Sequence, residues 1–403
     1  MYPTTAFLEK FMLRDFTPQA LIMGLITGFV GFSSSFAIVL QGLFAVGATQ
    51  EQAASGLTAM CIAMGVVAII LSAQRKMPIS VAWSTPGAAL MVNSGQLENG
   101  FAAAVGAFLV CGTLIIISGV WRPFGRAVEK LPVSLANAML AGILMPLCFA
   151  PVKAIGFDPM LGLPIALAWL IVGFFNKLAA VPAALLAFIL VIVFGVDLPT
   201  DTFEKLGQSV LPTIVLVTPI FDVAAIISLA LPLFLVTMAS QNIPGMAVLK
   251  ANDYNPKAGP LFTATGIFSV IAAPFGSHAV NLAAITAAMC ASPDAHPDKD
   301  KRYWSAITAG AVYVVIGVFA GVAITFVTLA PAILVEAVAG LALIGAFSAA
   351  AFGALKEEKD RHAAAVTFLI TASGVSFAGI SGAFWGLLAG LAILIASKFI
   401  ATK

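Results

Sequence analysis

The amino-acid sequence predicts an all-α integral membrane protein in which fourteen membrane-spanning segments form two inverted repeats of seven. Hydrophobic residues make up 61% of the chain and charged residues only 9%, whereas soluble domains carry roughly 25% charged residues. Fourteen spans of about 20 residues would occupy roughly 280 of the 403 residues, so only short loops remain. Lysine and arginine also collect on alternate sides of these spans, which is typical of a multi-pass membrane protein.

Proline, glycine and charged residues mark the ends of the apolar segments. If the N-terminus lies in the cytoplasm, every lysine and arginine except Lys153 and Lys205 falls on the cytoplasmic side, as the positive-inside rule requires. One miscounted span early in the chain would destroy this alternation, so we expect both termini in the cytoplasm. The predicted spans are residues 20–43, 51–72, 79–94, 98–120, 132–150, 159–175, 178–195, 222–247, 257–273, 275–290, 303–327, 330–354, 362–377 and 381–399.

The spans divide into two sets of seven, and an odd number of spans forces the second set to be inverted relative to the first. We therefore expect the first repeat in residues 1–200 and the second in residues 201–403. The polar segment 196–221 is the expected linker between them.

The first span of each half is interrupted by polar residues. Ser33 and Ser34 lie in the first span, and Gln241 and Asn242 lie in the eighth. Polar side chains are costly in lipid, so these residues are expected to face a protein interior or a water-filled cavity. For the serines, hydrogen bonds to carbonyl groups of their own helix are an equal alternative.

The third and tenth spans are the most informative segments of the chain. Residues 79–94 and 275–290 are each shorter than the roughly 18 to 20 residues of a complete span. The third contains W-S-T-P-G at residues 83–87, and the tenth contains G-S-H at residues 276–278. A matched pair of short spans interrupted by glycine or proline points to the binding site of a secondary transporter. The alternative for Pro86 is a simple kink in a long helix.

Two strings of residues accompany these interruptions: W-S-T-P-G-A-A-L at residues 83–90 and G-F-S-S-S-F at residues 31–36. With them the chain resembles the BenE family of benzoate:proton symporters, and the resemblance covers essentially the whole chain. It implies a secondary active transporter of the bacterial cytoplasmic (inner) membrane. The implied activity is import of benzoate, or a related aromatic carboxylate, together with a proton.

The BenE family is itself similar to uracil permease and to the sulfate/bicarbonate carriers, which share a fold of seven plus seven inverted segments. This similarity implies a core domain at about residues 18–120 plus 222–327, and a gate domain at about residues 121–200 plus 328–400. It also implies a short strand and a half-helix in each of spans three and ten, and a homodimer.

The similarity to uracil permease breaks down at two acidic positions. His278 stands where those permeases have a substrate-binding glutamate, and Ser240 or Gln241 stands where they have a second glutamate, used in proton coupling. This departure argues against a uracil-type substrate. It agrees with a substrate that is itself an anion.

We expect the substrate carboxylate to lie between the facing N-termini of the half-helices in spans three and ten, because a helix N-terminus offers free N–H donors and a partial positive charge. Hydroxyl and amide side chains would donate hydrogen bonds, glycine would let the ligand approach the backbone, and aromatic rings would pack against the substrate ring. The candidate substrate-binding residues are Ser33, Ser34, Phe36, Trp83, Thr85, Gly87, Gln241, Ser277, His278 and Asn281.

His278 is also the candidate for proton coupling. It is the only histidine within a predicted span, and a histidine ordinarily titrates near pH 6.5. A buried histidine bonded to a backbone carbonyl is the alternative. Glu336 is the only carboxylate placed clearly within a span. Its position near a helix N-terminus stabilises its negative charge, and a role in transport is the alternative.

Other classes of function find little support in the sequence. The net charge of +2 gives no case for nucleic acid as a partner, and the four cysteines have no metal-ligand spacing, so neither a metal nor another cofactor is expected. No metal-binding or catalytic motif of an intramembrane enzyme is present, so no catalytic residue is assigned. A carrier of nucleobases or inorganic anions with the same fold is the main alternative, and a channel is a further one.

Overall fold

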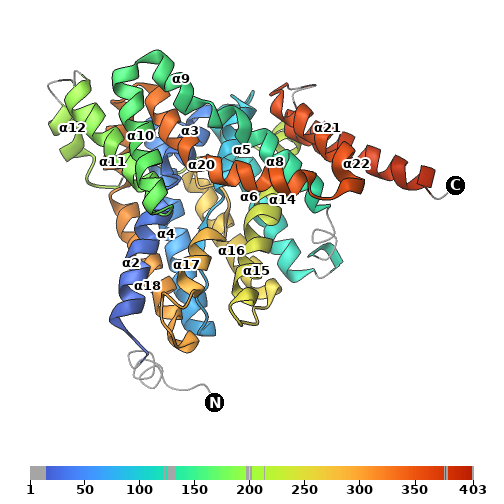
Figure 1. Ribbon diagram of the computed structural model, residues 1–403, viewed down its shortest axis with the longest axis horizontal. Coiled ribbons are helices and arrows are strands. Elements are labelled where there is room, and N and C mark those ends of the chain that lie inside the picture. Colours follow the sequence, from blue (N-terminus) through green and yellow to red (C-terminus); the bar gives the residue numbers. More distant parts are fainter. Residues whose placement is uncertain are drawn as a thin grey trace.

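The computed structural model describes residues 15–121, 123–125, 132–196, 199, 202–212, 214–375, 377 and 380–401. Within these residues the fold is almost entirely helical and contains one two-stranded sheet. Helices α2 (Pro18–Ser33), α4 (Gln50–Arg75) and α18 (Tyr303–Val318) pack together along one edge. Helices α21 (Arg361–Ala372) and α22 (Gly382–Ala401) pack against each other and project from the opposite side, as Figure 1 shows.

Among the described residues, seven helical segments are long and apolar enough to cross a membrane, or eight if a pair bent by 57° counts as one span. The bent pair is Lys299–Val318, which includes η4 (Lys299–Lys301) and α18, followed by α19 (Ala320–Thr328). The seven are α2 with α3 (Phe36–Ala45), α4, α6 (Gly100–Val120), α8 (Val133–Cys148) with α9 (Ala150–Phe157), the segment Val223–Ala251, α16 (Ala258–Ala272) with η3 (Ala273–Phe275), and α20 (Ala332–Leu355).

The remaining helices are not counted among these segments. Three of them are apolar: α10 (Pro159–Phe175), α11 (Ala180–Gly195) and α22. The others are α5 (Thr85–Ser94), α12 (Thr202–Gln208), α17 (Ile285–Ala291), α21 and the turn η5 (Glu358–Asp360). The prediction of a mostly helical membrane protein is confirmed, whereas the number fourteen, the inverted repeat and the two domains remain predictions.

The first predicted span, residues 20–43, is two helices rather than one. Helix α2 ends at Ser33 and α3 begins at Phe36, because Ser35 leaves the helical conformation with φ −150° and ψ 2°. The hydroxyl of Ser34 donates a hydrogen bond to the carbonyl of Gly31 at 3.2 Å. The serine cluster therefore breaks the span.

The eighth span, Val223–Ala251, contains two π-helical segments between its α-helices. Its elements in order are α13 (Val223–Ala225), η1 (Ile226–Ala230), α14 (Leu231–Thr237), η2 (Met238–Asn242) and α15 (Ile243–Ala251). Pro232 follows η1 and Pro244 follows η2. A proline inside a helix removes one backbone hydrogen bond and crowds the carbonyl four residues earlier, and a wider turn relieves this crowding.

Glycines let the helices of the first edge approach closely. A Cβ atom added at Gly65 of α4 would lie 2.4 Å from the carbonyl oxygen of Gly310 in α18, and one added at Gly310 would lie 2.7 Å from the carbonyl oxygen of Gly65. Small residues at such a crossing allow backbone-to-backbone packing, which holds membrane helices together.

Candidate functional site

A pair of short strands lies at the centre of the candidate site. Strand β1 (Val81–Trp83) pairs antiparallel with β2 (Val280–Leu282), with Val81 opposite Leu282 and Trp83 opposite Val280. Each strand is followed within three residues by a short helix, α5 after β1 and α17 after β2. The strands satisfy part of each other's backbone hydrogen bonding, which membrane-embedded backbone requires. The expected strand and half-helix in spans three and ten are confirmed.

Side chains from the eighth span brace this strand pair. Thr237 donates its hydroxyl proton to Ser84 Oγ at 2.7 Å, and the same Ser84 oxygen accepts the backbone N–H of Gly87 in the first turn of α5. Asn242 Oδ1 accepts the backbone N–H of Leu282 in β2 at 2.9 Å. The eighth span therefore contacts both strand–helix units.

Asn281 ties the two strands together. In the amide orientation that satisfies its hydrogen bonds, its Oδ1 accepts the backbone N–H of Ser84 and its Nδ2 donates to the carbonyl of Leu282, both at 2.9 Å. Its side chain is fully buried. This predicted substrate-binding residue is therefore engaged in holding the strands.

A cavity of about 260 Å³ lies between the two short helices and the surrounding spans. Thr85, the first residue of α5, and Ile285, the first residue of α17, both line it. Of the ten predicted substrate-binding residues, four line this cavity: Ser34, Trp83, Thr85 and Gln241. The remaining lining residues are Val30, Gly31, Ser35, Ala82, Lys177, Leu178, Val181, Ala283, Ala284, Thr286 and Ala342.

Trp83 supplies the aromatic wall of this cavity. Its indole Nε1–H donates to Ser35 Oγ at 2.8 Å, which fixes the orientation of the ring. Phe32 packs behind it, with the ring centroids 5.6 Å apart, and Phe36 stacks on Phe32 at 5.1 Å. Phe32 therefore lies between Phe36 and Trp83, and Phe36 does not line the cavity.

Four further candidates lie outside the cavity. Ser33 points back to its own helix, where its hydroxyl is 3.5 Å from the carbonyl of Val30. The hydroxyl of Ser277 donates to the carbonyl of His278. Gly87 packs against Leu233, where an added Cβ would lie 2.2 Å from Cδ1. Phe36 is only 4% exposed and packs as described above.

His278 lies in the loop before β2 and also stands apart from the cavity. Its ring is fully buried and meets Phe108 of α6 edge to face, with the centroids 6.3 Å apart. Neither ring nitrogen has a hydrogen-bond partner within the described residues. In this conformation the ring of His278 packs against Phe108.

Lys177 is the lining residue that the sequence analysis did not single out. It lies in the connection between α10 and α11, about 90 residues from both Thr85 and Ala82 in the chain. From the sequence, Lys177 is predicted only to lie on the cytoplasmic side, between the spans 159–175 and 178–195. Its position beside the strand pair arises from tertiary packing, which no local pattern reports.

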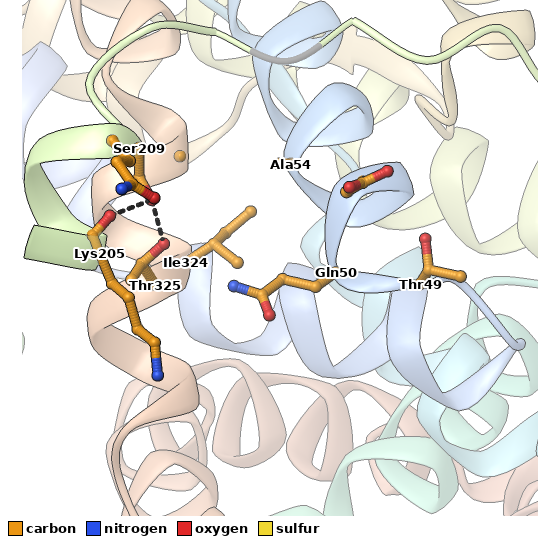
Figure 2. Close-up of a pocket in the computed structure, with 10 residues that line it drawn as sticks. Thr49, Gln50, Ala54, Lys205, Ser209, Ile324 and Thr325 are labelled. Carbon is orange, nitrogen blue, oxygen red and sulfur yellow. Dashed lines mark hydrogen bonds between the residues drawn. The ribbon is translucent and has the colours of Figure 1, made fainter. Parts of the chain in front are cut away.

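Two other cavities are separate from the strand pair. Glu336 of α20 and Gln41 of α3 both line a cavity of about 500 Å³, and the amide nitrogen of Gln41 is buried without a partner among the described residues. A cavity of about 630 Å³ lies between the start of α4 and helices α12 and α19. Figure 2 shows Gln50 pointing into it from α4, opposite Thr325 and Lys205. None of the described residues that line this last cavity is aromatic, so it does not fit an aromatic substrate.

The sequence matches a known family over nearly its full length. The family model described as BenE, benzoate membrane transport protein, matches residues 14–396. The chain is 39% identical over 392 residues to the inner membrane protein YdcO of Escherichia coli (strain K12), a match that covers 97% of this chain and 99% of that protein. It is 33% identical over 387 residues to the benzoate membrane transport protein of Acinetobacter baylyi, which covers 95% of this chain and 96% of that protein.

Solved structures resemble the fold at low sequence identity. The transmembrane domain of the cyanobacterial bicarbonate transporter BicA aligns with a TM-score of 0.57 at 15% identity, over 95% of this chain and 98% of that chain. SLC26A9 aligns with a TM-score of 0.62 at 13% identity, over 97% of this chain and 67% of that chain. The murine Slc26a9 anion transporter in its inward-facing state aligns with a TM-score of 0.61 at 12% identity, over 100% of this chain and 73% of that chain. These likenesses show the fold alone.

Proposed function

Because this chain belongs to the BenE family of benzoate membrane transport proteins, we propose that it is a secondary active transporter that imports benzoate or a close aromatic carboxylate together with a proton. The relatives are named as membrane and transport proteins, not as enzymes, and one is named as an inner membrane protein. Membership of the family supports a function in membrane transport. The identity of the substrate and of the coupling ion is what we propose.

The observation that carries the proposal is the cavity between the first residues of α5 and α17. Thr85 offers a hydroxyl beside one helix N-terminus, Gln241 offers an amide, and Trp83 offers an apolar ring. Helix N-termini attract anions because they carry partial positive charge. None of the described lining residues is acidic. A small molecule with a negative carboxylate and an aromatic ring matches both parts of this lining.

The volume agrees with a single-ring substrate. The cavity of about 260 Å³ lies just below the roughly 300 to 1,000 Å³ of typical small-molecule pockets. Such a space favours a compact ligand over a larger one.

Proton coupling has an energetic reason. A benzoate anion that enters a cell with a negative interior works against about 2.3 kcal/mol per 100 mV. Transport of one proton with each benzoate makes the cycle electroneutral and removes this cost. We propose His278 as the proton carrier, because it is a titratable group buried in the tenth span with both ring nitrogens unpartnered among the described residues.

The proposed architecture is the fourteen-span inverted repeat, with repeats at residues 1–200 and 201–403 and with core and gate domains divided as the resemblance implies. Two strand–helix units from the two halves, paired antiparallel, support this arrangement. Cytoplasmic termini and a homodimer belong to the same proposal.

A carrier of inorganic anions is the second candidate. It is favoured by the proteins of similar fold, which include a bicarbonate transporter and an anion transporter. Substrate competition separates the two candidates: binding of labelled benzoate to the purified protein, challenged by excess benzoate, uracil, sulfate or bicarbonate. Displacement by benzoate alone supports the proposed substrate, and displacement by sulfate or bicarbonate favours the second candidate.

A further inference from the structure

We infer that Lys177 is a substrate-binding residue, whose ammonium group binds the substrate anion where the cavity beside the strand pair joins a second cavity. This inference rests on the proposed anion transport. Its first support is position, because Lys177 lines both the cavity beside the strand pair and a second cavity of about 530 Å³ between α10, α11 and α20. The two cavities share Lys177, Val181 and Ala342, so they adjoin at this lysine.

The second support is charge. Among the described residues, Lys177 is the only charged residue that lines either cavity. The other polar groups of the first cavity are neutral hydroxyl and amide groups, such as those of Thr85 and Gln241. In the second cavity the polar side chains are those of Trp169 and Ser348. An anion that moves between the two cavities therefore meets one full positive charge, at the point where they join.

The third support is the local structure that places Lys177. Helix α10 ends at Phe175, and Asn176 caps the following turn: its Oδ1 accepts the backbone N–H of Leu178 at 3.0 Å and that of Ala179 at 3.4 Å. This turn holds Lys177 between the two helices. Lys177 is exposed, and the ion pairs within the described residues do not include it, so its charge is available to a ligand.

The alternative role is that of an interfacial lysine, which lies beside lipid headgroups and helps to orient the helices. The two roles differ in a measurable way. An interfacial lysine affects insertion and stability, whereas a substrate-binding lysine affects the affinity for anions and the dependence of that affinity on salt.

The test compares purified Lys177→Gln, Lys177→Arg and Lys250→Gln with the wild type. Lys250 is an exposed lysine in the last turn of α15, is predicted on the same side of the membrane, and lines neither cavity. Dissociation constants are measured by calorimetry for benzoate, sulfate and bicarbonate at low and high salt, together with the melting temperature of each variant.

For Lys177→Gln we expect about tenfold weaker binding of the anion that the wild type binds, the effect of losing one charge-assisted hydrogen bond, and a weaker dependence on salt. Lys177→Arg should retain affinity within about threefold because the charge is preserved, and Lys250→Gln should match the wild type. Equal affinity of Lys177→Gln and wild type, at equal melting temperature, overturns the inference. If the wild type binds sulfate or bicarbonate instead of benzoate, the proposed substrate is wrong, but a tenfold loss in Lys177→Gln still supports the role of Lys177.

Discussion

The side chain of Asn242 accepts the backbone N–H of Leu282 at 2.9 Å, so a π-helical turn of the eighth span holds strand β2 directly. Both residues are buried. The strand is only three residues long, and this contact adds to the hydrogen bonds that Ser269 makes to Val280 in the same strand. This contact links the polar interruption of the eighth span to the broken tenth span.

Replacement of Asn242 by leucine should destabilise the protein and abolish transport. The backbone N–H of Leu282 would lose its acceptor in a buried site, at a cost of about 1–3 kcal/mol. The measurement is thermal unfolding in detergent together with benzoate binding. Asn252→Ala is the matched control: among the described residues the side chain of Asn252 bonds only the carbonyl of Val248 in α15, at 3.0 Å, so this variant should leave both quantities nearly unchanged. A fully stable, active Asn242→Leu variant would show that β2 is held by other contacts.

Thr85→Val should weaken benzoate binding about tenfold without loss of stability. Valine keeps the shape of threonine but removes the hydroxyl that lines the cavity, and one hydrogen bond to a charged group accounts for a change of this size. The control is Ser33→Ala, because Ser33 points to Val30 and lies outside the cavity. Titration calorimetry on both variants checks the prediction. Equal losses in the two variants would contradict the assignment of this cavity as the substrate site.

Trp83→Phe should weaken benzoate binding only a few-fold, whereas Trp83→Ala should reduce it much more. Phenylalanine preserves an aromatic wall but loses the hydrogen bond to Ser35 that orients the ring, while alanine removes the wall itself. Competition with cyclohexanecarboxylate, a ring acid without aromatic character, reports whether ring stacking contributes. If Trp83→Ala binds benzoate like the wild type, the aromatic ring of the substrate lies elsewhere.

His278→Gln should abolish uphill uptake and preserve exchange of labelled for unlabelled benzoate, because exchange requires substrate binding but no net proton movement. Glu336→Gln is the matched comparison: Glu336 lines a different cavity, with Gln41, and its removal should leave gradient-driven uptake intact. If Glu336→Gln instead lost gradient-driven uptake of benzoate while His278→Gln kept it, Glu336 of α20 rather than His278 would be the proton-coupling residue.

The strand–helix units were expected from the resemblance to carriers of this fold, and local signals in the sequence explain where they form. Residues 83–87 combine a β-forming tryptophan, a helix-capping serine and a proline in the first helical turn, and the structure places β1 and α5 around them. The break of the first span within the serine cluster was missed, although the polar residues themselves were noticed.

The set of lining residues was predictable only in part. Ser33 and Ser34 are neighbours in sequence, but successive residues of a helix point about 100° apart, so Ser34 lines the cavity and Ser33 does not. The orientation of the helix about its axis decides between them, and the sequence does not fix this orientation. Lys177 was missed for a related reason, since helices distant in sequence bring it to the site.

The most direct test of the account is uptake of labelled benzoate into proteoliposomes, with and without an inward proton gradient and with the membrane voltage clamped to zero. We predict accumulation that follows the proton gradient and collapses when a protonophore is added. Uptake that only equilibrates, at the same level with and without the gradient, would contradict proton-coupled import.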